Sequence, residues 1–598
     1  MFRYIALSWD VSQPASSAAA RLLGMAWQAR SAWDGVVRRP GLQVFTTGSP
    51  GPDINDAHRL PGGTGVVLGK LFRRRELDAP PARGVQLDSR EAAGIADSCA
   101  RSLVSDFWGR YVAFVQSPSG STCVLRDPSG TLPCFRARHE GVDIIFSWLE
   151  DALEMLGPAK TLAVNWDALT AQLCLGVLSG RASALDGVSQ VLPGEVIELP
   201  AGNSAMLWSA VDVARSCEPC NAEEAADRLR STVRACTRAW ASCYDTLLLR
   251  LSGGVDSSIV LGCLVPGSTP ADVIAVNYHS PGSDSDERVY ARLAATRAGR
   301  DLLEHERDAG FRVEQVLMAA RMPAPVPYVG WMNAGTDARL ASAYAAPAMF
   351  TGAGGDPLFY EYPRWWPAAD YLHDRGFDAG FPAAAMDAAR LGKLSVWRTA
   401  ALALKECIRP DLAARTPPSL QGLLTHAVLQ QSKEAHRFTH PALGEADDLP
   451  LGKYMQAVAL MYPLGYYDPF EQARAPELVN PLLSQPLVEL CLRLPTYVLT
   501  QGGRGRALAR RAFTAELPAQ IANRRSKGGM EEHIKAVLNA NIGLVRSLLL
   551  DGELSRRGLI ERSRIEELLS GRPTALAGAV SQIHALTAVE AWLTRWTR

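Results

Sequence analysis

Apolar runs alternate with turns and with segments of helical spacing along the middle of the chain. Leu247–Leu251 is typical of a buried strand, and an apolar segment of helical length follows it after a Ser-Gly-Gly turn. Val273–Tyr278 and Leu302–His305 are further strand-like runs, and Asp286–Ala298 between them has helical spacing. This alternation predicts a doubly wound parallel sheet, which binds ligands at the carboxyl ends of its strands.

The first third of the chain has a different pattern, in which short β-prone runs are separated by Gly, Pro, Asp and Ser. These runs are Gly65–Phe72, Trp108–Val115 and Ile144–Trp148. Asn221 then has the character of a helix N-cap. We therefore predict two domains, residues 1–210 and residues 221–598.

A loop of small and polar residues, SGGVDSS, joins the strand at 247–251 to its helix. A loop in this position directs backbone N–H groups and the positive helix end at one point, which is how proteins hold phosphate. Asp256 supplies a hard oxygen ligand for Mg²⁺. No lysine follows the glycines, so this is not the GxxxxGK[ST] loop of kinases and GTPases. The ATP or pyrophosphate contacts that we expect here are Leu251, Ser252, Gly253, Gly254, Asp256, Ser257 and Ser258, with Val276 on the next strand.

A second loop, TGAGGD at Thr351–Asp356, directly follows the apolar residues Ala348–Phe350. It again places glycines and one carboxylate at the carboxyl end of a predicted strand. We expect Gly352 to contact ATP. We expect Asp256 and Asp356 to share Mg²⁺, because this ion takes one or two protein carboxylates together with phosphate oxygens.

A cationic run beside a Gly-Gly turn, IANRRSKGGME at Ile521–Glu531, is the third passage of interest. Arg524 and Arg525 fit the usual interpretation of such a run as a solvated face. With this passage, the three loops resemble the ATP pyrophosphatases of the asparagine synthetase superfamily. Lys527 matches the catalytic lysine of that superfamily, whose ammonium neutralises charge near the α-phosphate as an acyl-adenylate forms and breaks down.

Three passages of the first domain also carry a resemblance: GRYVAFV, RDPSGTLPCF and DGVSQVLPGEVIEL. They resemble the amidotransferase-like half of class II glutamine-dependent synthetases. Together the two resemblances imply an α/β protein. Its N-terminal part would be a class II amidotransferase-like αββα domain, and its C-terminal part a doubly wound ATP-pyrophosphatase domain.

Two departures from these families limit the chemistry that we expect. Active class II amidotransferases use an N-terminal cysteine as nucleophile, but here Phe2 follows the initial methionine and no cysteine precedes Cys99. We therefore expect no glutamine hydrolysis. Ala353 stands where asparagine and β-lactam synthetases carry a glutamate, which argues against both of those reactions.

The passage NPLLSQP at Asn480–Pro486, the Gly-Gly-Arg run after it and RRSKGG look most like the lasso-peptide cyclases. That resemblance implies an ATP- and Mg²⁺-dependent ligase that adenylates an Asp or Glu side chain of a ribosomal precursor peptide. The N-terminal amine of the peptide then forms a macrolactam. The partners would be the precursor (lasso) peptide, a leader peptidase and a leader-recognition protein. The alternative is a small-molecule amide synthetase of asparagine synthetase or β-lactam synthetase type.

Composition and charge narrow the classes of function that remain. The 62 basic and 62 acidic residues cancel, which counts against an RNA-modifying PP-loop enzyme and any nucleic-acid partner. A non-catalytic nucleotide-binding regulator is the other class left open. No run reaches the roughly 18 apolar residues of a membrane helix, and the 11 cysteines are scattered, so we expect a cytoplasmic protein without a membrane partner. The Ala/Leu-rich segment from Gly376 to Pro450 is expected to be helical and to offer peptide-specific contacts.

Overall fold

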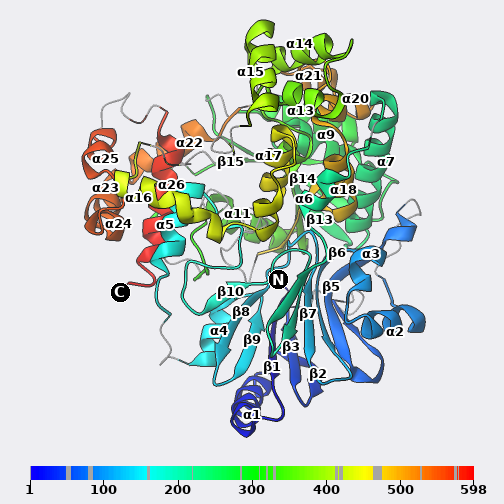
Figure 1. Cartoon of the computed structure of the whole chain (residues 1–598), viewed down its shortest axis with the longest axis vertical. Helices are drawn as coiled ribbons and strands as arrows, with labels where there is room; N and C mark the ends of the chain where they lie inside the picture. The colour runs from blue at the N-terminus through cyan, green and yellow to red at the C-terminus, as the bar shows by residue number, and fades with distance from the viewer. Residues whose placement is uncertain are drawn as a thin grey trace.

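The computed structural model describes most of the chain (Figure 1). The described residues are 2–597 except 49–55, 78–84, 158–161, 219, 283–285, 309, 318–320, 327–330, 411–414, 416–419, 421, 462–474, 526–527, 571–575 and 577. Among them, no helix is both long and apolar enough to cross a membrane.

The N-terminal part consists of two six-stranded antiparallel sheets packed face to face. The first sheet has the order β10 (Val188–Gln190), β8 (Phe135–His139), β9 (Val142–Phe146), β1 (Arg3–Trp9), β3 (Leu42–Thr47) and β2 (Asp34–Arg39). The second has the order β12 (Asn203–Met206), β11 (Glu195–Leu199), β7 (Thr122–Arg126), β6 (Phe107–Gln116), β5 (Gly65–Arg73) and β4 (Ala57–Arg59). Alternate apolar side chains of both sheets, among them Tyr4, Phe114 and Ile145, form one buried cluster between them.

Helices cover the outer face of each sheet. The helices α1 (Pro14–Gln28) and α4 (Leu149–Leu156) share a buried cluster with β1 and β9. The helices α2 (Ser89–Asp97) and α3 (Ser102–Asp106) share another with β5 and β6. The four layers confirm the predicted αββα arrangement. Two of the predicted β-prone runs lie within β5 and β6, and the third overlaps β9 at Ile144–Phe146 but continues to the N-cap of α4.

A five-stranded parallel sheet forms the centre of the second part. Its order is β15 (Leu302–Glu306), β14 (Asp272–His279), β13 (Thr246–Arg250), β16 (Ala348–Phe350) and β17 (Glu477–Val479). One face packs on α7 (Ala222–Ala241), α8 (Val255–Gly262) and α9 (Arg288–Ala298), and the other on α11 (Trp331–Ala343). Helices on both faces of a parallel sheet confirm the predicted doubly wound fold.

Helix α9 starts two residues later than predicted. It begins at Arg288, not Asp286, and Val289 is 63% exposed. Its buried face consists of alanines, Ala291, Ala294, Ala295 and Ala298. The alanines pack in the core beside the sheet, and the backbone of the first turn lies close to Gly253 of the first loop.

Most of the remaining helices belong to two stretches of the chain, one after β16 and one after β17. An insertion after β16 contains α12 (Gly355–Leu358), α13 (Trp366–Arg375), α14 (Phe381–Gly392), α15 (Val396–Ile408), α16 (His426–Gln431) and α17 (Leu451–Leu460). After β17 come α18 (Gln485–Arg493), α19 (Thr496–Leu499), α20 (Ala507–Ala512), α21 (Ala519–Ala522), α22 (Glu531–Ala540), α23 (Ile542–Asp551), α24 (Glu553–Arg556), α25 (Arg562–Leu568) and α26 (Val580–Leu593). Side chains of α22–α26 share a buried cluster with β1. One apolar core therefore includes residues on both sides of the predicted boundary near residues 210–221. The division into two domains stays a prediction.

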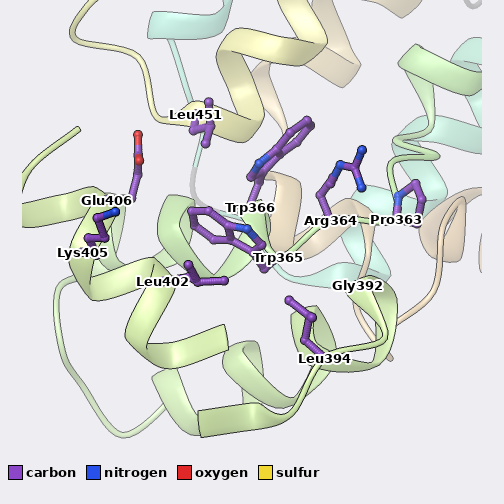
Figure 2. A pocket seen from close by; sticks show the side chains of 10 residues that line it. All are labelled: Pro363, Arg364, Trp365, Trp366, Gly392, Leu394, Leu402, Lys405, Glu406 and Leu451. Atoms are coloured by element: carbon purple, nitrogen blue, oxygen red, sulfur yellow. The ribbon is translucent and has the colours of Figure 1, made fainter. Parts of the chain in front are cut away.

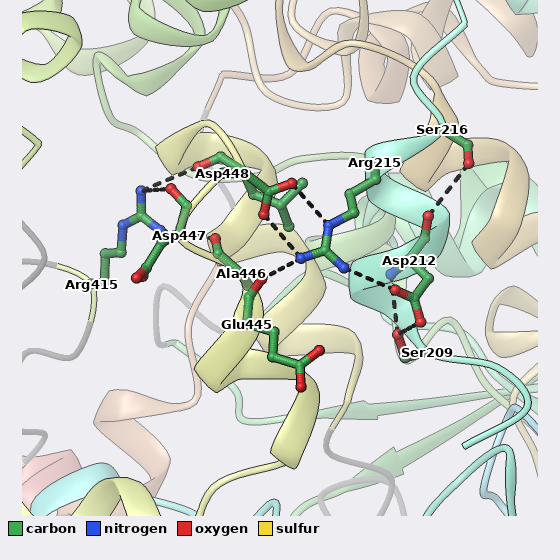
Figure 3. A network of polar contacts seen from close by, with 10 residues as sticks. Ser209, Asp212, Arg215, Ser216, Arg415, Glu445, Ala446, Asp447 and Asp448 are labelled. Atoms are coloured by element: carbon green, nitrogen blue, oxygen red, sulfur yellow. Dashed lines mark hydrogen bonds and ion pairs between the residues drawn. The ribbon is translucent and has the colours of Figure 1, made fainter. Parts of the chain in front are cut away.

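The junction between the two parts is an ordered helix, α6 (Ala210–Arg215) (Figure 3). The Arg215 guanidinium makes two contacts with Asp448, at 2.9 and 3.0 Å, and one with Asp212 at 2.9 Å. Arg415 donates to the main-chain carbonyls of Ala446 and Leu449 in the same loop. The segment before α17 is therefore fastened to the end of the first domain.

A buried ion cluster joins the second antiparallel sheet to the edge of the parallel sheet. Glu477 on β17 accepts from Lys70 of β5 at 2.8 Å and from Arg110 of β6 at 3.0 Å. Lys70 also contacts Asp56 at 3.0 Å. Burial opposes the charge on Glu477, but the attraction of Lys70 and Arg110 outweighs it and lowers the pKa to about 2.

We predict that Glu477→Gln lowers the free energy of unfolding by about 3–5 kcal/mol, because it leaves buried cations without their shared partner. Denaturant midpoints measure the loss. The contribution of a depressed carboxyl pKa is present above its usual value of 4.5 and is lost as the pH falls toward 2. The difference from wild type should therefore shrink over that range. Glu223→Gln, at an ion pair whose glutamate is 83% exposed, is the control and should leave the midpoint unchanged.

Candidate active site

The SGGVDSS loop connects β13 to α8 and has a preformed conformation. Gly253 has φ 78°, and a Cβ on it would lie 2.8 Å from the Cβ of Tyr290 in α9. Gly254 is the N-cap of α8. Its N–H donates to Ser252 Oγ at 3.2 Å, and that hydroxyl lies 3.2 Å from Ser257 Oγ. The loop therefore presents small residues and hydroxyls at a helix N-terminus, as a phosphate site requires.

The second loop lies directly against the first. A Cβ on Gly352 would come within 2.5 Å of the Ser257 nitrogen, and one on Gly355 would overlap the Asp256 carboxylate. Both positions accept only glycine without displacement of the other loop. The structure thus brings together Asp256 and Asp356, which are 100 residues apart in the sequence.

Leu251, just after the end of β13, lies beside Val276 in β14. The Leu251 N–H donates to the Val276 carbonyl at 2.8 Å, and Asn277 donates to the Leu251 carbonyl at 2.7 Å. The Val276 side chain is fully buried on the α11 face of the sheet, so its expected contact with ATP involves main-chain atoms at most. Ser258 Oγ is buried and has no hydrogen-bond partner within the described part of the chain.

Arg506 is a site residue that the sequence analysis did not identify. Its Nε and Nη2 contact the two Asp256 oxygens at 2.7 and 2.9 Å, Nη2 also contacts Asp356, and Nη1 lies 2.5 Å from Glu361. Burial works against its charge, but the three carboxylates outweigh it and raise the pKa of Arg506. Arg506 belongs to the Gly-Gly-Arg run that carries part of the family resemblance, but no sequence pattern places this side chain opposite the aspartates.

The donor set at this point fits magnesium. A cationic group already stands between Asp256 and Asp356, whose oxygens are the hard ligands that Mg²⁺ prefers. Among the residues described, no group of three or more His, Cys, Asp or Glu side chains is arranged to hold a metal by itself. An ion here would therefore take its other ligands from phosphate and water. The two-aspartate metal site stays a prediction.

Lys527 lies outside the described residues, but its neighbours are placed beside the first loop. The Gly528 N–H donates to Glu287 at 2.8 Å, and Arg524 contacts the same carboxylate at 2.6 Å. Glu287 is the N-cap of α9, and its carbonyl lies 3.0 Å from the position of a Cβ on Gly253. Arg524 is only 10% exposed, so the interpretation of it as solvated is wrong, whereas Arg525 is exposed.

These features are typical of a doubly wound α/β protein, with two glycine loops and three carboxylates gathered at the carboxyl edge of its parallel sheet. The family model for asparagine synthase matches residues 224–594, and the chain belongs to this family. The match indicates ATP-dependent amide bond formation. No curated protein matches the chain.

Two solved structures are similar to parts of the chain. One is described as the allosteric regulatory enzyme of purine biosynthesis, with 10% identity, a TM-score of 0.20, and coverage of 51% of this chain and 74% of that one. The other is glutamine phosphoribosylpyrophosphate amidotransferase from B. subtilis with ADP and GMP, with 10% identity, a TM-score of 0.21, and coverage of 58% and 81%.

We predict that Gly355→Ala reduces ATP–pyrophosphate exchange by about 10²-fold or more, because the new methyl group displaces Asp256, and misplacement by about 1 Å costs that much. Gly444→Ala is the matched control, since a Cβ there meets nothing within 4 Å. Equal exchange rates in the two variants would contradict the assignment of this contact to the active site.

Proposed function

We propose that the protein forms a macrolactam in a ribosomal precursor peptide of the lasso type. An Asp or Glu side chain of the peptide attacks the α-phosphate of ATP, which gives an acyl-AMP and pyrophosphate. The N-terminal amine of the peptide then displaces AMP. In this proposal the SGGVDSS loop binds pyrophosphate, Asp256 and Asp356 hold Mg²⁺, and Lys527 stabilises charge at the α-phosphate. The ion would neutralise phosphate charge when bound.

A cavity lined in part by residues that follow the second loop in the chain is the observation that carries the proposal (Figure 2). It has a volume of about 400 Å³ and is lined by Pro363, Arg364, Trp365, Trp366, Gly392, Leu394, Leu402, Lys405, Glu406 and Leu451. Tryptophan and leucine side chains with a few charged groups at the edge suit an amino-acid side chain of a peptide. They offer little to ammonia, the amine of a glutamine-dependent synthetase.

The cavity and the nucleotide site share structural elements. Asp356 and the cavity residues Pro363–Trp366 belong to one continuous stretch of chain, which also carries Glu361. On the other side, α14 ends in the cavity residue Gly392 and holds the Arg506 loop, where Gly502 donates to Asp387 at 2.8 Å. A peptide bound in the cavity would therefore lie close to ATP, and holding both reacting groups in place replaces a bimolecular encounter.

The source of the amine also supports a peptide substrate. A glutamine-dependent synthetase obtains ammonia through a cysteine nucleophile, so a cysteine near β1 has to be considered for that role. Cys134 lies beside Tyr4 of β1, but burial raises the pKa of this thiol to about 11. A thiol of that pKa is a poor nucleophile near neutral pH. Ala353 in the second loop offers a methyl group where the asparagine and β-lactam synthetases have a carboxylate. A leader peptidase that frees the peptide N-terminus, and a leader-recognition protein, are the partners that this reaction requires.

The test is a single-turnover reaction with ATP, Mg²⁺, precursor peptide and the partner peptidase. We expect pyrophosphate release and the loss of one water from the peptide, both slowed about 10²–10³-fold by Lys527→Met, because one preorganised charge at the transition state is removed. Arg525→Met, an exposed neighbour, is the control and should react normally. Amide formation with a free amino acid or ammonia, and none with the peptide, would favour the small-molecule synthetase instead.

We predict that Trp366→Ala raises the KM for the peptide by about 10-fold or more, because one buried aromatic contact at a binding site contributes more than 1 kcal/mol. ATP–pyrophosphate exchange at saturating peptide should change little. Trp397→Ala is the matched control, since Trp397 is 83% exposed on α15 and does not line the cavity. An unchanged KM for the peptide in Trp366→Ala would show that the cavity does not bind the substrate.

A further inference from the structure

Arg506 occupies the place between two aspartates that a metal ion would need. Both Asp256 oxygens are engaged by its guanidinium, at 2.7 and 2.9 Å, and Nη2 reaches Asp356 as well. With Glu361, three carboxylates surround one guanidinium, which leaves two formal negative charges. The neighbouring Arg504 and Arg510 donate to main-chain carbonyls of the segment at 521–524.

A magnesium ion would compete with the guanidinium for these carboxylate oxygens, because Arg506 already engages both oxygens of Asp256. Mg²⁺ binds oxygen at about 2.0–2.1 Å in near-octahedral geometry. Beside Arg506, whose side chain is 5% exposed, a divalent cation would also be strongly repelled, because little water screens the two charges. Arg506 and a metal ion would therefore compete for Asp256 and Asp356.

We propose that Arg506 is an internal counter-cation of the nucleotide-free enzyme, and that its guanidinium leaves Asp256 and Asp356 when the metal binds with ATP. This inference rests on the magnesium assignment within the proposed function. The guanidinium holds the two loops together before ATP arrives and keeps metal affinity low in its absence. Metal and nucleotide then bind together, because the ATP phosphates supply metal ligands and negative charge that offset the loss of the Arg506 contacts.

The surroundings of Arg506 suit a side chain with two positions. Its backbone is left-handed, with φ 55° and ψ 23°, which is an uncommon conformation for a residue with a side chain. Its third partner, Glu361, is 40% exposed and lies on the opposite nitrogen, Nη1, from the one shared by the aspartates. The guanidinium therefore keeps a carboxylate partner when it turns away from Asp256 and Asp356.

The experiment titrates Mn²⁺ alone, without ATP or peptide, into the full chain and follows free Mn²⁺ by electron paramagnetic resonance. We expect Arg506→Gln to bind Mn²⁺ about 10-fold more tightly than wild type or better, because coupling between competing ligands is commonly of that size. Mn²⁺ should also raise the Tm of this variant more than that of wild type. Arg511→Gln, at an exposed ion pair on the same helix, should match wild type.

Equal or weaker Mn²⁺ binding by Arg506→Gln would overturn the inference, as would the absence of binding in both proteins. If Arg506→Gln does not fold without metal, Arg506→Lys is measured. Its ammonium cannot bridge as the guanidinium does, so tighter binding supports the inference and unchanged binding overturns it. Because this assay uses no turnover, a protein that shows the expected Mn²⁺ behaviour but forms no macrolactam would contradict the proposed function alone.

Discussion

The buried charge of Glu477 is the constraint on which the active-site geometry depends. Lys70 and Arg110 reach this carboxylate from the antiparallel sandwich, and β17, which carries it, is an edge strand of the parallel sheet. Three residues further on, Asn480 accepts from Thr351 at 2.5 Å, at the start of the second loop. The antiparallel sandwich thus has a structural role toward the second loop, because a buried charge accepts very few alternative arrangements.

A second constraint is the close approach of two glycine loops. Gly352 and Gly355 lie against Ser257 and Asp256 with no room for a Cβ. This contact brings the buried Asp256 carboxylate next to the more exposed Asp356, and neighbouring like charges favour a cation between them. Arg506 supplies it in the structure, so the glycine contacts and the arginine are parts of one arrangement.

The sequence predicted those parts of the site whose signal is local. SGGVDSS and TGAGGD each combine an apolar strand, a glycine turn and a carboxylate within a few residues, and both lie at the carboxyl edge of the parallel sheet as expected. The cationic run at Arg524 has no local pattern that indicates its burial. Its burial depends on Glu287 and Tyr290, which are more than 200 residues away and carry no pattern of their own.

The sequence by itself determined the fold class and the two loops, because strand and helix periodicity and glycine turns are read within a short window. Only the tertiary structure decided which charges meet. Arg506 contacts aspartates that precede it by 250 and 150 residues, and Glu477 contacts a lysine 407 residues before it. The tryptophan-lined cavity has the same origin, since residues of α13, α14, α15 and α17 line it. Such contacts depend on packing between distant segments, which local sequence patterns do not encode.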